Sequence, residues 1–199
     1  PRMLRQVPIM LQLGSYYSVG VSGPESLREN LVSQMILQLA MHIGYDELKI
    51  CILGDMMMHS GQIENARTST SEYDFSTYFL YLEDKIKDAD IAIANMEYTL
   101  AGKPYTGYPT FSAPEAYATY LAGLGIDVFL SANNHIFDKG TAGANRTIDK
   151  FRRLGVQITG IAQDQQMYEQ VFPLILECKG TSIALVNVTY GTNIGDGKE

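Results

Sequence analysis

Carboxylate, amide and imidazole side chains recur in this sequence just after three short apolar runs. The runs are LKICIL, IAIA and VFLSA, and the polar residues that follow them are Asp55, His59, Asn95, Glu97, Asn133, Asn134, His135 and Asp138. Such ligands, without thiolates, suit Mn, Fe, Zn or Mg, and Asp or Glu oxygens can bridge two ions. A metal pair can hold a phosphate and convert bound water to hydroxide, and an imidazole can protonate the leaving oxygen. The residue types therefore indicate the chemistry of metal-dependent hydrolysis.

The same residues also have a purely structural interpretation. Asp and Asn are common in turns and at helix N-termini, so Asn95 could cap its loop and Asp138 the helix that follows it. A histidine in a loop is most often solvated or hydrogen-bonded. The three consecutive methionines 56–58 are expected to pack against the sheet. Residue spacing alone leaves both interpretations open.

Strands and helices must alternate to carry these polar groups. Helices are expected at 74–88, 115–123 and 142–154, between strands that contain LKICIL, IAIA, DVFLSA and VQITG. This alternation predicts a mostly parallel sheet, and ligands bind where the carboxyl ends of parallel strands meet. The runs VFPLILEC and TSIALVNVTY, joined at Lys179-Gly180, predict an antiparallel hairpin. The expected fold class is α/β, a three-layer structure with helices on both faces of the sheet and antiparallel strands near the C-terminus.

The composition is that of a folded domain with an acidic balance. The 199 residues are 46% hydrophobic and 19% charged. Lys and Arg number 15 against 22 Asp and Glu, and the formal charge of -7 argues against nucleic acid as a partner. Cys51 and Cys178 lie in apolar runs, so neither a disulfide framework nor a CxxC metal site is expected. No apolar stretch is long enough to span a bilayer, and PRMLRQVPIM lacks a signal-peptide pattern, so the chain is expected to be soluble as given.

Residues 1–47 follow a separate pattern. The runs PIMLQL and YYSVGVSG indicate two strands, and apolar residues recur at helical spacing from Glu25 to about Ile43, before Gly44. We expect a strand-turn-helix extension over 1–47 that packs on the sheet of a domain over 48–199.

Several long and specific stretches follow one another between residues 48 and 193. They are GDMMMHSGQ, YDFSTYF, ADIAIANMEYTLAGKPYTGYPTFSAP, ANNHIFDKG and NVTYGTN. Together they resemble the poly-gamma-glutamate capsule-synthesis family, the CapA-type proteins, which look like a branch of the calcineurin-like metallophosphatases. The resemblance implies a partial metallophosphatase fold, metal-dependent phosphoesterase-type chemistry, and an anionic polymer or a small phosphoester as substrate. It also implies a location in the bacterial cytoplasm or, after loss of a leader, in the cell envelope; the oligomeric state stays open.

The resemblance also assigns roles to single residues. His135 is implied to be the catalytic general acid, and Asp138 a ligand or the group that orients His135. The implied metal ligands are Asp55, His59, Glu97 and Asn134, and the implied substrate-binding residues are Asn95, Lys103, Tyr105 and Asn133. In the loop LAGKPYTGYPTFSAP, Lys103 would meet an anionic polymer or a phosphate. Equally, this loop could be a proline-fixed connection whose tyrosines cover the edge of the sheet.

The sequence departs from this family in two ways. The family pattern continues beyond NVTYGTN to HWG-type and GHxH-type motifs that complete the metal site, whereas this chain ends at Glu199. We therefore expect a C-terminally incomplete domain with one weak divalent-metal site and impaired hydrolysis. Residues 5–55 bear a weaker resemblance to FtsK/SpoIIIE-like ATPases of type VII secretion, but SGPESLREN lacks the lysine of a P-loop. The alternative function is a non-catalytic α/β module, a degenerate nucleotide-binding or partner-binding domain.

Overall fold

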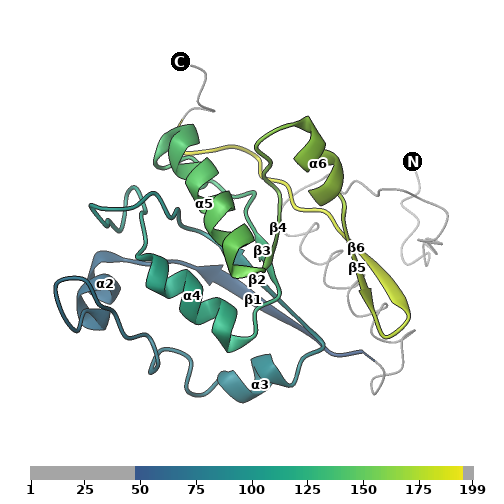
Figure 1. The fold of residues 1–199 in the computed structure, drawn as a ribbon, viewed down its shortest axis with the longest axis horizontal. Coiled ribbons are helices and arrows are strands. Elements are labelled where there is room, and N and C mark those ends of the chain that lie inside the picture. The colour runs from purple at the N-terminus through teal and green to yellow at the C-terminus, as the bar shows by residue number, and fades with distance from the viewer. Residues whose placement is uncertain (1–47, 195–199) are drawn as a thin grey trace, which may run out of the picture. The chain divides into compact units, whose positions relative to one another are not determined.

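The computed structural model describes residues 48–194, and the structural statements below concern that part of the chain (Figure 1). Its centre is a four-stranded parallel sheet in the order β1-β2-β3-β4. The strands are β1 (Ile50–Met56), β2 (Ile91–Met96), β3 (Val128–Leu130) and β4 (Gln157–Thr159). The expected extension over 1–47, and with it most of the FtsK-like stretch, lies outside the described residues.

The strand order explains where the helices lie. The strands follow chain order without reversal, and right-handed crossovers between such strands place their helices on the same face of the sheet. The described helices are α2 (Ser60–Ala66), α3 (Glu83–Lys87), α4 (Glu115–Leu124), α5 (Gly140–Leu154) and α6 (Gln165–Val171). Each of them contributes a side chain to one buried cluster, which also contains Ala92, Ala94 and Met96 of β2. This cluster is the larger core of the domain.

The opposite face of the sheet packs against a hairpin of β5 (Leu174–Cys178) and β6 (Thr181–Leu185). A second buried cluster joins hairpin and sheet, and its members are Ile91, Ile93, Val128, Leu174 and Leu176. Lys179 and Gly180 have φ values of 49° and 75°, as both central residues of a type I′ turn require. The expected α/β class, with a parallel sheet and antiparallel strands near the C-terminus, is therefore confirmed. Helices were expected on both faces, but within residues 48–194 this face is covered by the hairpin and not by helices. The hairpin forms its own two-stranded sheet.

Within residues 48–194, the helix boundaries agree with the sequence in two of the three expected places. The helices expected at 115–123 and 142–154 are α4 and α5, and each ends at a glycine in the left-handed conformation, Gly125 or Gly155. The single helix expected at 74–88 is wrong: only α3 forms there. Asp74 instead accepts a hydrogen bond from the Ser76 amide at 2.9 Å, and successive turns follow. The short helix α2 was not expected.

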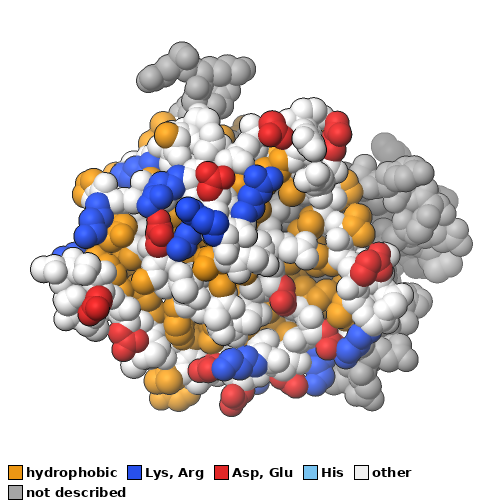
Figure 2. Space-filling view, viewed as in Figure 1, with side chains coloured by type: hydrophobic (Ala, Val, Ile, Leu, Met, Phe, Trp, Pro, Cys, Tyr) orange, Lys and Arg blue, Asp and Glu red, His pale blue; other side chains and the backbone are white. Residues whose placement is uncertain are grey.

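Charged side chains lie on the outer surface of the helical layer (Figure 2). Arg146 and Lys150 of α5 both form ion pairs with Glu115 of α4, the latter at 3.1 Å. These contacts connect the two longest described helices at the solvent side, away from their buried faces. None of the helices within residues 48–194 combines the length and the hydropathy needed to cross a membrane.

Candidate active site

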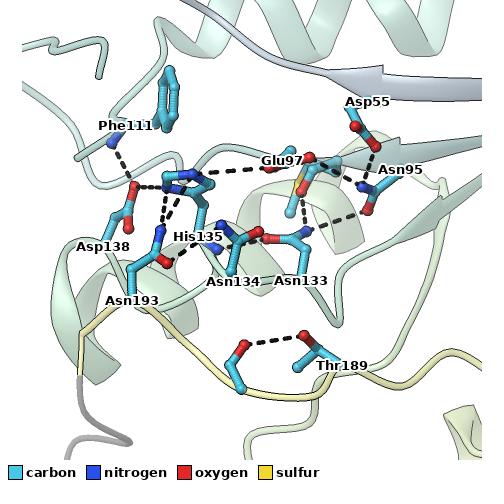
Figure 3. Close-up of polar contacts among 12 residues, drawn as sticks. Asp55, Asn95, Glu97, Phe111, Asn133, Asn134, His135, Asp138, Thr189 and Asn193 are labelled. Carbon is cyan, nitrogen blue, oxygen red and sulfur yellow. Dashed lines mark hydrogen bonds and ion pairs between the residues drawn. The ribbon is translucent and has the colours of Figure 1, made fainter. Parts of the chain in front are cut away.

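The carboxyl ends of β1, β2 and β3 bring the three polar groups of the sequence to one edge of the sheet (Figure 3). Asn95 lies at the centre of this network. Its Nδ2 donates to Asp55 Oδ1 at 2.7 Å and lies 3.4 Å from Glu97 Oε2. Its Oδ1 accepts from Asn133 Nδ2 at 3.3 Å. The groups converge because neighbouring parallel strands end side by side.

Asn133 holds the loop after β3 in place. Its Nδ2 donates to the Met96 carbonyl at 2.7 Å, and its Oδ1 accepts from the His135 amide at 3.0 Å. The side chain is buried, so these bonds replace water. Asn133 thereby connects the end of β2 to the backbone of His135, a structural task for a residue that the resemblance assigns to substrate binding.

His135 and Asp138 form a buried pair. His135 Nδ1 lies 2.7 Å from Asp138 Oδ2, and the two side chains are 5% and 0% exposed. The same Asp138 oxygen accepts a hydrogen bond from the Phe111 amide at 2.7 Å. Because a carboxylate only accepts, Nδ1 carries the proton, and Nε2 faces Glu97 Oε1 at 3.8 Å. The imidazole ring is therefore held by Asp138, with Nε2 directed at the Glu97 carboxylate.

Glu97 lies in an electrostatically unfavourable position for an isolated carboxylate. Burial, together with the negative charge of Asp55, raises the pKa of the Glu97 carboxyl, and the neighbouring His135 opposes this effect. A cation near both carboxylates would relieve their repulsion. The electrostatics of this edge thus favour a positively charged ligand.

The donor types at this edge fit one divalent cation. Asp55 and Glu97 direct carboxylate oxygens toward the same point, at which the Asn95 amide nitrogen lies. An asparagine side chain can rotate to present its oxygen instead. No set of three or more His, Cys, Asp or Glu side chains within residues 48–194 is arranged to hold a metal. Carboxylate and amide oxygens are the ligands that Mg and Mn prefer, so a cation at this edge would be bound mainly by oxygen.

Two of the predicted metal ligands lie at the border of this network or outside it. His59 is exposed, and its backbone amide donates to Gln62 Oε1 at 2.8 Å at the start of α2. Its ring lies edge-on to Phe111, with centroids 5.2 Å apart. Asn134 lies beside His135, with its Nδ2 3.4 Å from Asn193 Oδ1. The structure brings Asp55 and Glu97 together through Asn95. It places the His59 ring against Phe111, whose ring also contacts His135.

The loop after β2 carries the remaining predicted substrate-binding residues. Tyr105 is partly buried, and its ring lies edge-on to Tyr73 with centroids 5.8 Å apart. Lys103 is exposed. The packing of Tyr105 agrees with the structural interpretation of this loop, and it leaves Lys103 as the residue available to an anionic ligand.

Two residues of the site were missed in the sequence. Phe111 is fully buried, and its ring lies edge-on to His135, with centroids 4.7 Å apart. Asn193 Nδ2 lies 3.3 Å from each ring nitrogen of His135. The backbone amide of Asn193 donates to the Asn134 carbonyl at 2.8 Å. Both occur in the stretches YPTFSAP and NVTYGTN, which are the only signal the sequence offers. Their contacts to His135 join distant parts of the chain, so residue spacing could not reveal them.

The comparison with known families agrees with the motifs. The family model described as bacterial capsule synthesis protein, PGA_cap, matches residues 49–199 and so includes every residue of the site above. A search of curated proteins finds no match to the chain. Since the family model spans well over half of the sequence, the chain belongs to the PGA_cap family of bacterial capsule synthesis proteins.

Proposed function

We propose that this protein is a CapA-like, metal-dependent phosphoesterase that acts in poly-gamma-glutamate capsule synthesis. The observation that carries the proposal is the buried imidazole of His135, which is held by Asp138 and directed at Glu97. Membership of a capsule synthesis family supports the biological context. We assign the activity to a domain over residues 48–199.

The carboxylates of Asp55 and Glu97 would hold the cation, and the amide oxygens of Asn95 and Asn134 could complete its ligand shell. When bound, a divalent cation lowers the pKa of a water molecule and offsets the charge of a phosphate. The His59 ring packs on Phe111, so we propose that the ligand shell consists mainly of these oxygens. We therefore expect one weak site.

His135 is proposed to give a proton to the leaving oxygen. Nδ1–H donates a hydrogen bond to Asp138 Oδ2 at 2.7 Å, which fixes the ring. In the imidazolium form Nε2 carries the second proton, and that proton would pass to the leaving oxygen. The ring of Phe111 and the amide of Asn193 limit its rotation. Lys103, exposed in the loop that ends beside the site, is proposed to meet the negative charge of the substrate.

Hydrolysis of p-nitrophenyl phosphate in millimolar manganese tests the proposal. The expected result is slow, metal-dependent turnover that falls about 10²-fold or more in His135→Gln. Glu97→Gln should lower turnover and also raise the manganese concentration that gives half-maximal turnover. Glu64→Gln, at an exposed position of α2, is the matched control and should leave the rate unchanged.

Two results would contradict the proposal. Turnover that survives His135→Gln would remove the general acid from the mechanism. A complete lack of turnover with every divalent metal would favour the alternative, a non-catalytic α/β module in which these residues only cap and connect the strand ends.

A further inference from the structure

An open cavity of about 490 Å³ lies at the carboxyl ends of β3 and β4. Its walls include Ala132, Gly160, Ile161, Tyr168, Phe172 and Asn187. Ala132 directly precedes the loop 133–135 of the candidate site. The cavity and the site therefore share the chain segment that leaves β3.

The floor of the cavity is fixed by close contacts among three segments. Asn187 Oδ1 accepts from the Ala132 amide at 2.6 Å, and Asn187 Nδ2 lies 3.5 Å from the Ala132 carbonyl. Gly160 has a φ of +89°, and a Cβ there would lie 2.1 Å from Asn187 Oδ1 and 2.6 Å from the Ala132 nitrogen. Only glycine allows this approach. The segment that begins at Asn187 continues to Asn193, which contacts the His135 ring.

The lining suits a flat group without negative charge. Tyr168 and Phe172 stack with centroids 5.3 Å apart and planes at 27°, and Tyr168 remains 45% exposed. The charged residue among the lining residues is Asp164, whose Oδ1 accepts from the Met167 amide at 2.8 Å to start α6. A cavity with a carboxylate and without a cation disfavours an anion, whereas aromatic faces favour a ring. Its volume is in the range of pockets for small organic molecules.

We infer that this cavity binds an uncharged ring, and that it takes the ring of the ester group when a phosphoester occupies the candidate site. The second half of this inference rests on the proposed function. It narrows the substrate class: a small ring-bearing phosphoester fits both the site and the cavity, whereas an anionic polymer would place like charge against Asp164.

Equilibrium dialysis with 1-naphthol tests the cavity without any need for turnover. Wild-type protein should bind this probe, and Tyr168→Ala should weaken binding about 2- to 10-fold through loss of the aromatic face. Ala162→Trp, which places an indole ring in the cavity, should weaken binding at least as strongly. Tyr81→Ala, at a position 94% exposed on the surface, is the control and should bind like wild type.

The substrate class is tested by comparing KM for 1-naphthyl phosphate and for glycerol phosphate. The expected result is that Tyr168→Ala raises KM for the naphthyl ester alone. Equal affinity of wild type and Tyr168→Ala for 1-naphthol, or no binding at all, would overturn the inference. If 1-naphthol binds as expected while neither ester is hydrolysed, the cavity assignment stands and the proposed hydrolysis fails, so the two failures are distinguishable.

Discussion

Asp138 is the residue on which the geometry of the candidate site depends most directly. Its Oδ2 accepts hydrogen bonds from His135 and from the Phe111 amide, while its Oδ1 is buried without a hydrogen-bond partner within residues 48–194. Asp138→Ala would leave the buried Phe111 amide unpaired and the imidazole unsupported. We expect a loss of about 2–3 kcal/mol in the free energy of unfolding. Urea denaturation measures this loss, with Asp84→Ala at an exposed position of α3 as the control. If Asp138→Ala lowered the free energy of unfolding by less than Asp84→Ala does, a structural role for the His135–Asp138 pair would be contradicted.

At the scale of single residues, the sequence predicts which polar residues follow a strand better than it predicts which side chains contact one another. Asp55 and Glu97 could be placed at one edge of the sheet because both follow buried strands, and the structure does bring them together. His59 shows the limit of this reasoning, since its proximity along the chain to Asp55 says nothing of where its ring points. The roles of Phe111 and Asn193 depend on packing across long sequence separations and were not predictable.

At the scale of elements, Gly160 directly follows β4 and lies against Ala132 and Asn187, which belong to two other segments of the chain. Gly160→Ala should destabilise the protein in two ways, by the positive φ and by the collision of the new Cβ with Asn187 and Ala132. Gly155→Ala is the matched control, because its φ is +73° but nothing lies within 4 Å of its Cβ position. We expect the midpoint of thermal unfolding to fall in both variants, and further in Gly160→Ala. In Gly155→Ala the positive φ alone should lower the free energy of unfolding by about 1–2 kcal/mol. An equal loss in the two variants would contradict the close contact at Gly160.

The elements that the sequence predicted well are those with local signals. The two longest helices of the described part of the chain end at glycines, and the hairpin turn has residues suited to positive φ. The helix expected at 74–88 fails because tertiary packing overrides local periodicity. Phe75 is buried against the rings of Tyr78 and Tyr117, with centroids 5.5 and 5.0 Å apart, which the successive turns permit.

At the scale of the whole molecule, Asp90 connects the hairpin to the parallel sheet. Its Oδ2 accepts from Lys179 Nζ at 2.8 Å and from the Lys49 amide at 2.7 Å. The Lys179 hydrogen bond, followed by that of Lys49, lowers the pKa of the Asp90 carboxyl in the folded protein. Because the pKa is lowered on folding, the ionised Asp90 carboxylate stabilises the folded protein. This stabilisation is fully present above the pKa of the carboxyl in the unfolded chain, about 4, and is lost as the pH falls through the lower pKa of the folded protein.

Asp90→Asn should therefore be less stable than wild type at neutral pH, and the difference should shrink as the pH falls below about 4. Urea denaturation across this pH range measures the effect, with the exposed Asp84→Asn as the control. A difference between wild type and Asp90→Asn that grows on acidification would have the wrong sign and would contradict the assignment.

We propose that Asp55 and Glu97 form a weak site for one divalent cation, and thermal unfolding with increasing manganese shows whether a cation binds there. A ligand that binds only the folded state stabilises it by RT ln(1 + [L]/Kd), so the unfolding temperature rises with ligand concentration. We expect millimolar manganese to stabilise the wild type and the exposed-site control Glu64→Gln, but neither Asp55→Asn nor Glu97→Gln. An unfolding temperature that manganese leaves unchanged in the wild type, or raises equally in all four proteins, would contradict the claim.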